Sequence, residues 1–232
     1  MTRFAALRLA LFATFFLSNI PAQGQGIQQV IQGMQARWAR IQDASAVIEI
    51  QTWDKSKGDK VDVFYGQIYY RAPELIRLEY SPAPESVTGT PKLYPLGENK
   101  FIYIHDGRKL LRYSHSQKGW FDQVGNDPVI SMVNQITDIN NFNVERFLSI
   151  YQVADVRSDN SLGIPCYILR AEPKVRGGQH PRQLLWINQR TYLPLEAILA
   201  RSTNEVSCFF HKVDQNPRLP SSVFSTQWRK PE

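Results

Sequence analysis

The chain has 232 residues, a length that allows one large domain or two small ones. Hydrophobic residues make up 43% and charged residues 21% of the chain, which is ordinary for a globular protein and argues against intrinsic disorder. The formal net charge is +6, but the basic residues are scattered and form no dense stripe interleaved with aromatics. This distribution argues against a nucleic-acid-binding protein.

Residues 1–24 have the pattern of a secretory signal peptide. Arg3 and Arg8 give a positive start, apolar residues fill 9–17, and small residues at positions −3 and −1 suit cleavage after Gly24. The apolar run is shorter than the roughly 20 residues that a membrane-spanning helix needs. We therefore expect an exported, soluble protein with a net charge of +4, because the signal contains two arginines and no acids.

The segment 26–41 has the periodicity of an amphipathic helix. Apolar residues recur at three- and four-residue spacing on one face, while glutamine and arginine occupy the other. Such a stripe must bury against another part of the protein. Its apolar positions are Ile27, Val30, Ile31, Met34, Trp38 and Ile41.

After residue 45 the pattern changes to short runs with period two, separated by turn residues. An Asp-Gly pair at 106–107 predicts a tight hairpin, because such a turn requires positive φ. About a dozen short strands joined mostly by hairpins predict a large antiparallel sheet or barrel. The expected strands are 45–53, 61–71, 75–80, 99–105, 109–115, 119–124, 150–156, 164–171, 182–189, 194–201, 205–213 and 223–228.

Two segments interrupt the series of strands. Asp127 can cap a second helix that has Pro128 in its first position, followed by Val129, Met132 and Val133 at helical spacing. The stretch 81–100 holds four prolines and two glycines, which predicts a long loop.

Some strands are apolar on both faces. In 182–189, Leu185 and Ile187 alternate with Leu184 and Trp186, whereas a sheet with one wet face alternates apolar with polar residues. A sheet with two apolar faces must be covered on one side and curl around something on the other. The amphipathic helix is expected to fill part of that concave side.

The chain contains two cysteines, Cys166 and Cys208, both in strand-like runs. In an exported protein a cysteine pair is more often bridged than free, so a disulfide between them is expected. The alternative is two buried free thiols. No cysteine or histidine cluster has the spacing of a metal site.

The sequence has no catalytic signature. The four histidines are isolated from one another along the chain, and neither a serine elbow nor a glycine-rich phosphate loop is present. We therefore expect no enzyme activity, no cofactor and no metal.

Four stretches, in this order, resemble the LolA-like family, the periplasmic carriers of outer-membrane lipoproteins. They are the helix with the following strand SAVIEIQ, the block GQIYYRAPELIRLEY at 66–80, the hairpin HDGRKLLRY at 105–113 and the ending NPRLPSSVFS at 216–225. The chain departs from the family's Arg-Pro block, because Ala72 separates Arg71 from Pro73. The loop at 81–100 is also longer than in typical carriers.

The resemblance implies a single domain at 25–232 with a mainly β fold. This fold is an unclosed, strongly curved antiparallel half-barrel of about 11 strands, with helices as a lid over an apolar cavity. In the family the cavity receives the acyl chains of a lipoprotein. The residues that would form the cavity and lid here are Val30, Ile31, Met34, Trp38, Val129, Met132 and Val133.

By the same resemblance Arg71 takes the place of an arginine that hydrogen-bonds the backbone of the lid helix. The alternative is an edge arginine that only marks the end of a strand before Pro73. Arg77 is expected to face solvent and to pair with a neighbouring acid, either Glu79 or Glu49.

The function implied is that of a monomeric periplasmic carrier. Its partners would be acylated lipoproteins, an inner-membrane lipoprotein-releasing ABC transporter and an outer-membrane acceptor lipoprotein, and nucleic acid would not bind. Because one fold can serve several functions, a LolA-fold sensor or lipid-trafficking protein of the cell envelope is the alternative.

Overall fold

The computed structural model describes residues 22–54, 56, 58, 61–72, 75–83, 96, 100–106, 108–122, 144–161, 163–175 and 180–226. The helices in these ranges are α1 (Ala22–Trp38), α3 (Val144–Ile150) and the short 3-10 helix η2 (Ser221–Phe224). The strands are β1 (Asp43–Asp54), β2 (Val61–Arg71), β3 (Leu75–Pro82), β4 (Phe101–Asp106), β5 (Leu110–Ser114), β6 (Gly119–Asp122), β7 (Tyr151–Ser161), β8 (Ile164–Pro173), β9 (Arg182–Asn188), β10 (Pro194–Ala200) and β11 (Asn204–Gln215).

All of these strands belong to one sheet, in the order β6-β5-β4-β3-β2-β1-β11-β10-β9-β8-β7. Every pairing is antiparallel, and most join strands that follow each other in the chain. The exception is β1, which lies between β2 and the last strand, β11. Strands β6 and β7 are the two edges, so the predicted unclosed antiparallel sheet of about 11 strands is confirmed.

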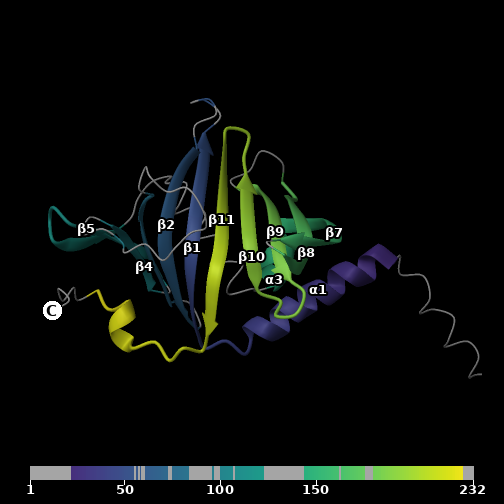
Figure 1. Cartoon of the computed structure of the whole chain (residues 1–232), viewed down its shortest axis with the longest axis horizontal. Helices are drawn as coiled ribbons and strands as arrows, with labels where there is room; N and C mark the ends of the chain where they lie inside the picture. The colour runs from purple at the N-terminus through teal and green to yellow at the C-terminus, as the bar shows by residue number, and fades with distance from the viewer. Residues whose placement is uncertain are drawn as a thin grey trace, which may run out of the picture.

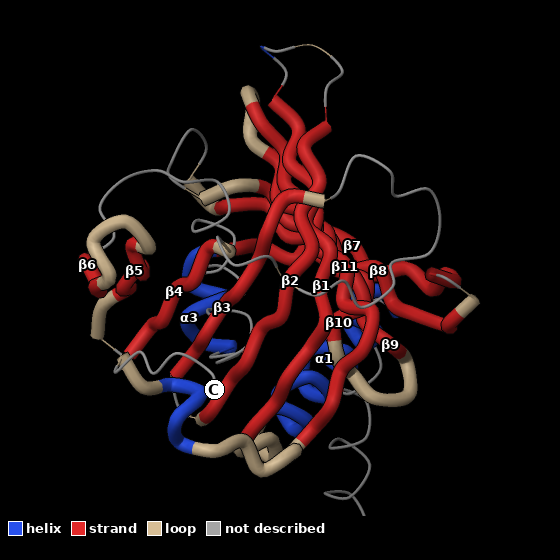
Figure 2. The backbone as a smooth tube through the Cα atoms, turned by 60° about the vertical axis from the view of Figure 1, so that its left-hand side comes forward, coloured by secondary structure: helices blue, strands red, loops and turns tan. Residues whose placement is uncertain are grey.

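The sheet is strongly curved, and α1 and α3 lie on its concave side (Figures 1 and 2). Alternate residues of each strand face this side, which explains the period-two pattern of the sequence. In β1, for example, Ala44, Ala46, Ile48 and Ile50 are buried in the core. The core thus fills the space between the curved sheet and the helices.

The outer face of the sheet is also covered at one end. Ile102 and Ile104 of β4 have exposed fractions of 0% and 1%, yet they alternate with Tyr103, which belongs to the main core. The C-terminal segment 216–226 crosses the outer side near β3 (Figure 2). Strand β4 is therefore buried from both sides, whereas in β9 Leu184 and Trp186 of the second face are only partly buried.

The sequence pattern located the first ten strands and most of β11, but two elements differ from expectation. The strand predicted at 223–228 is wrong, because residues 221–224 form η2. Helix α3 was not predicted; it is short and carries the buried Phe147, which stacks on Tyr151 with ring centroids 5.0 Å apart. In the described ranges, no helix is long and apolar enough to cross a membrane.

Helix α1 also differs in its bounds. It begins at Ala22, upstream of the predicted cleavage point after Gly24, and it ends at Trp38 instead of residue 41. Ile41 is buried in the connection to β1. The signal peptide itself stays a prediction, since residues 1–21 lie outside the described ranges.

Candidate functional site: an apolar cavity under helix α1

The predicted apolar stripe of α1 faces the concave side of the sheet. Val30, Ile31 and Met34 are buried there, with Met34 fully enclosed. Trp38, in the last turn, is partly buried and packs edge-on against Tyr70 of β2, with ring centroids 6.0 Å apart. The sequence therefore identified the side of the helix that meets the sheet, although it did not identify the sheet residues opposite.

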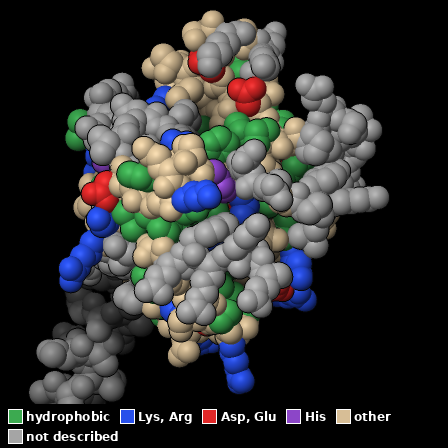
Figure 3. Space-filling model, turned by 90° about the vertical axis from the view of Figure 1, so that its left-hand side faces the viewer, with side chains coloured by type: hydrophobic (Ala, Val, Ile, Leu, Met, Phe, Trp, Pro, Cys, Tyr) green, Lys and Arg blue, Asp and Glu red, His purple; other side chains and the backbone are tan. Residues whose placement is uncertain are grey.

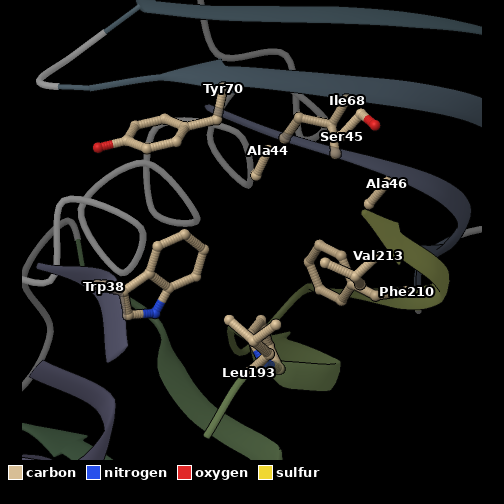
Figure 4. Close-up of a pocket in the computed structure, with 10 residues that line it drawn as sticks. Trp38, Ala44, Ser45, Ala46, Ile68, Tyr70, Leu193, Phe210 and Val213 are labelled. Carbon is tan, nitrogen blue, oxygen red and sulfur yellow. The ribbon is translucent and has the colours of Figure 1, made fainter. Parts of the chain in front are cut away.

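A small apolar cavity of about 30 Å³ lies beside Trp38, between α1 and the sheet. This volume is about one water molecule's share of the liquid, far below the roughly 300–1,000 Å³ of a typical ligand pocket. Its walls come from α1, β1, β2, β11 and the start of β10 (Figure 4). The residues that line it are Trp38, Ala44, Ser45, Ala46, Ile68, Tyr70, Leu193, Pro194, Phe210 and Val213.

The wall formed by β11 contains a bulge. The pairing of β1 with β11 shifts between Val47 and Ile48, so that His211 is passed over. Bulges turn side chains to a new direction. In a regular strand, residues three positions apart face opposite sides of the sheet. Because of the bulge, Phe210 and Val213 both line the cavity.

Trp38 places one polar atom in these apolar surroundings. Its indole N–H is buried and has no hydrogen-bond partner in the described structure. A buried donor without an acceptor is unfavourable, and native proteins contain few of them. The cavity therefore combines apolar walls with one donor that a bound carbonyl or carboxylate oxygen could satisfy.

A second hollow, of about 200 Å³, opens on the other side of the same wall. It shares Leu193, Pro194, Phe210 and Val213 with the cavity beside Trp38. Its remaining lining comes from the ends of β7, β8 and β9, from the β9–β10 turn, and from β10 and β11. These residues are Ser161, Ile164, Asn188, Thr191, Leu195, His211 and Gln215.

Aromatic side chains continue the concave wall away from Trp38. Tyr80 of β3 stacks on Phe101 and Tyr103 of β4, with centroids 5.0 and 5.9 Å apart, and packs edge-on against Phe64 of β2 at 5.6 Å. Large rings of this kind supply apolar area with few rotatable bonds.

In the described structure Arg71 contacts β1 and the C-terminal segment. Its Nε donates to Asp43 Oδ1 at 2.8 Å, its terminal nitrogen donates to the carbonyl of Leu219, and its guanidinium lies 5.0 Å from the ring centroid of Phe224. Asp43 Oδ2 in turn accepts the Leu219 N–H at 3.2 Å. Among the described residues Arg71 therefore fastens the C-terminal segment to the sheet, and the lid-latch hypothesis stays a prediction.

Arg77 is also held under the C-terminal segment. It pairs with Glu79 as predicted, with Arg77 Nε 2.5 Å from Glu79 Oε1, but its side chain is only 12% exposed and so does not face solvent. A terminal nitrogen donates to the carbonyl of Val223 at 3.0 Å. Lys100 forms a second ion pair with Glu79.

The expected disulfide is absent, because Cys166 and Cys208 are both buried free thiols. On one face of the sheet, Cys208 of β11 pairs with Ala197 of β10, Ala197 with Leu185 of β9, and Leu185 with Leu169 of β8. Cys166 is three residues from Leu169 along β8, so its side chain is on the other face of the sheet. It is also three strands away from Cys208. A disulfide requires Cα atoms about 4.4–6.8 Å apart, so this arrangement cannot form one.

Three of the predicted lid residues, Val129, Met132 and Val133, lie outside the described residues, as does most of the loop at 81–100. On the side of the molecule that carries β4 to β6, lysine and arginine side chains are spread out and form no single patch (Figure 3). This agrees with the scattered basic residues of the sequence.

Two contacts on α1 were not found from the sequence. The ring of Tyr192 covers Gly33 so closely that a Cβ added there would lie 2.6 Å from Tyr192 Cζ. Asn216 holds the connection between α1 and β1, since its Oδ1 accepts the N–H groups of Gln42 at 2.8 Å and Asp43 at 3.3 Å. Both contacts join residues more than 150 positions apart, and no local pattern reveals such pairs.

The sequence matches no protein-family model and no curated protein. Solved structures share its fold at low identity. An uncharacterised conserved protein from Thermus thermophilus is 10% identical, with a TM-score of 0.50 over 90% of this chain and 96% of that chain. A LolA superfamily protein from Nitrosomonas europaea is 14% identical, with a TM-score of 0.43 over 85% and 96%. A putative outer membrane lipoprotein-sorting protein domain from Vibrio parahaemolyticus is 11% identical, with a TM-score of 0.41 over 84% and 94%.

The chain therefore shares with the Thermus thermophilus protein an unclosed antiparallel sheet that curves around an amphipathic helix. At such identities the likeness is one of fold. This chain has a small apolar cavity beside Trp38 and a C-terminal segment bound to the outer face of the sheet.

Proposed function

We propose that this protein is a periplasmic carrier that shields the acyl chains of lipoproteins while they cross the aqueous space between two membranes. By resemblance to LolA-like proteins, its partners are an inner-membrane lipoprotein-releasing transporter and an outer-membrane acceptor lipoprotein. The protein acts by binding and release, without catalysis.

The observation that supports this proposal is the small apolar cavity under α1. Transfer of a sixteen-carbon chain from water to an apolar site is worth roughly 13 kcal/mol, at about 0.8 kcal/mol per methylene. Widening a cavity of about 30 Å³ to admit an acyl chain uses part of this free energy, so the net affinity falls to a range that permits release. A cavity that is small when empty therefore suits a carrier that works without an energy source.

The chemistry of the cavity also suits an acyl chain with a polar end. The buried indole N–H of Trp38 is a donor without a partner in the described structure, and it borders apolar walls. An ester, amide or carboxylate oxygen next to an aliphatic chain would accept this hydrogen bond. Acyl chains of lipoproteins carry carbonyl groups of this kind at one end.

The decisive experiment is native mass spectrometry of the mature protein purified from its host envelope. Co-purification of an acylated lipoprotein is the expected result. A free phospholipid, or no bound lipid at all, would contradict the carrier function and would favour the sensor or lipid-trafficking alternative.

A cavity-filling variant tests the location of the site. Ala46 lines the cavity, and Ala46→Leu adds a side chain that takes up its volume. We expect the affinity for a fluorescent fatty acid, 11-(dansylamino)undecanoate, to fall by at least about fivefold, because the chain and the new side chain compete for one space. Titration of the dansyl fluorescence measures the affinity.

The matched control is Ser207→Leu. Ser207 lies on the neighbouring strand β11 between the buried Val206 and Cys208, and so faces away from the core. The same added side chain there should leave binding unchanged. Equal losses in the two variants would show that the chain binds elsewhere.

A further inference from the structure

The β9–β10 turn, residues 188–193, is built as a braced unit. The backbone N–H of Asn188 donates to the Leu193 carbonyl at 2.9 Å, and the Asn188 carbonyl accepts the Tyr192 N–H at 2.8 Å. The Asn188 side-chain oxygen accepts two more N–H groups, from Arg190 at 2.9 Å and from Thr191 at 3.0 Å. Hydrogen bonds of one asparagine thus fix the shape of the whole turn.

Tyr192 is held in an unusual conformation at the end of this turn. Its φ of 56° lies in the left-handed region, which is rare for a bulky residue other than glycine. Such strain persists where the surroundings hold it, and it often marks a functional position. The ring stacks on Tyr167 of β8, with centroids 6.3 Å apart, and its other contact is with α1.

The contact with α1 is made at Gly33. Any side chain at this position would collide with the Tyr192 ring, so the glycine allows the ring to lie directly on the helix backbone. Gly33 is one residue before the fully buried Met34. The β9–β10 turn therefore clamps the middle of the helix that borders the cavity.

The same turn is also the partition between the two hollows. Leu193, which follows Tyr192, lines both the apolar cavity of about 30 Å³ beside Trp38 and the second hollow of about 200 Å³, here called the outer hollow. Asn188 and Thr191 line only the outer one. A displacement of Tyr192 must carry Leu193 with it, and this would join the two hollows into one continuous groove.

We propose that the β9–β10 turn is a gate in the cavity wall, latched shut by Tyr192 on Gly33, and that an acyl chain enters from the outer hollow by displacing this turn. The proposal rests on the proposed function, since it names the entry route of the same site. The gate acts together with α1, because the latch joins them.

Variants of Tyr192 test the latch through the rate of chain uptake, measured by stopped-flow fluorescence with 11-(dansylamino)undecanoate. Tyr192→Asn keeps a residue that tolerates the left-handed backbone but removes the ring, so uptake should be about five- to tenfold faster. Tyr192→Phe keeps the ring and should match the natural protein. Gly33→Ala pushes the ring away from α1 and should act like Tyr192→Asn.

The position of the gate is tested at the mouth of the outer hollow. Ile164 is 37% exposed there, and Ile164→Trp narrows the mouth with little effect on the core. Uptake and release should both slow by a similar factor, leaving the affinity unchanged. The control is Val61→Trp on β2, where the side chain is 44% exposed and belongs to neither hollow.

Two outcomes would overturn the gate. One is equal uptake rates for Tyr192→Asn, Tyr192→Phe and the natural protein; the other is an unchanged rate for Ile164→Trp.

If the natural protein binds no fatty acid at all, the proposed function fails, and hydrogen exchange then tests the latch on its own. In Gly33→Ala or Tyr192→Asn, amides of residues 30–38 should exchange faster than in Tyr192→Phe, and equal exchange would refute the latch.

Discussion

Arg71 and Arg77 lie six positions apart on the outer face of β2 and β3, and both hydrogen-bond backbone carbonyls of the C-terminal segment. A planar guanidinium with five donors can bind a carboxylate and a carbonyl together. This accounts for two arginines in the middle of apolar strands. Their partners could not be read from the sequence, because Leu219 and Val223 are about 150 residues away.

The carboxylate of Glu79 is the centre of this outer network. Glu79 is only 7% exposed and pairs with both Arg77 and Lys100. We expect Glu79→Gln to lower the free energy of unfolding by about 2–3 kcal/mol, since two partly buried cations lose their counter-charge. Urea denaturation monitored by circular dichroism measures the change.

The control for Glu79→Gln is Asp122→Asn. Asp122 pairs with Lys109 at 2.8 Å, but its side chain is 62% exposed. An exposed pair of this kind contributes little, so the loss should stay below about 1 kcal/mol. Equal losses in the two variants would show that burial of Glu79 has no energetic effect.

Helix α1 is fixed at three places: its buried stripe, the clamp at Gly33 and the junction at Gln42. The stripe was predictable, because apolar periodicity reports which face of a helix is buried. The clamp and the junction were not predictable, because Tyr192 of the β9–β10 turn makes the first and Asn216, after β11, makes the second. The strand predicted at 223–228 failed for a related reason. The carbonyl of Val223 is taken by the Arg77 side chain, and β1 to β3 already have neighbours on both sides.

The junction can be tested at Asn216. Its Oδ1 accepts the N–H groups of Gln42 and Asp43, where the connection from α1 meets β1. Its φ of 51° suits asparagine or glycine better than alanine. Asn216→Ala should lower the free energy of unfolding by about 2 kcal/mol, and Asn216→Gly by about 1 kcal/mol, because glycine loses only the hydrogen bonds. Urea denaturation of both variants gives the two values.

Hydrogen exchange shows whether Asn216 controls the junction itself. In both variants, amides of residues 39–43 should exchange faster than in the natural protein. Arg218→Gly, at another left-handed position with φ of 55°, should leave their exchange unchanged. Protection at 39–43 that survives in Asn216→Ala would contradict the role of Asn216.

For the molecule as a whole, the class of fold could be predicted but the arrangement of its parts could not. Alternation and turn residues indicated a large antiparallel sheet, and strands with two apolar faces indicated curvature. The order of strands depends on the pairing of β1 with β11, which are separated by most of the chain. The same long-range order placed Cys166 and Cys208 on opposite faces, so the disulfide prediction failed.

Burial of ionisable groups predicts a loss of stability at high pH. Burial, and then the charges of Glu196 and Glu49, raise the pKa of the Cys208 thiol, while burial and then Glu79 raise the pKa of Tyr69. Each group keeps its proton in the folded state at a pH where the unfolded chain has lost it. The contribution of these two groups to the free energy of unfolding should therefore be complete below about pH 8 and fall as the pH rises further.

The contribution of Cys208 is measured by urea denaturation under reducing conditions at pH 7.5 and pH 10. Cys208→Ala removes one titrating group, so its stability should fall less between these two values than that of the natural protein. Tyr69 still titrates in the variant, which keeps part of the fall. An identical fall in both proteins would show that Cys208 does not contribute.

The pairing of the first strand with the last also decides when the cavity can exist. One wall comes from β1 and β2 and the opposite wall from β10 and β11, so the two halves of the chain must meet before the cavity forms. Contacts between such distant parts of a chain form slowly. A chain whose β11 has not yet been synthesised therefore lacks this cavity.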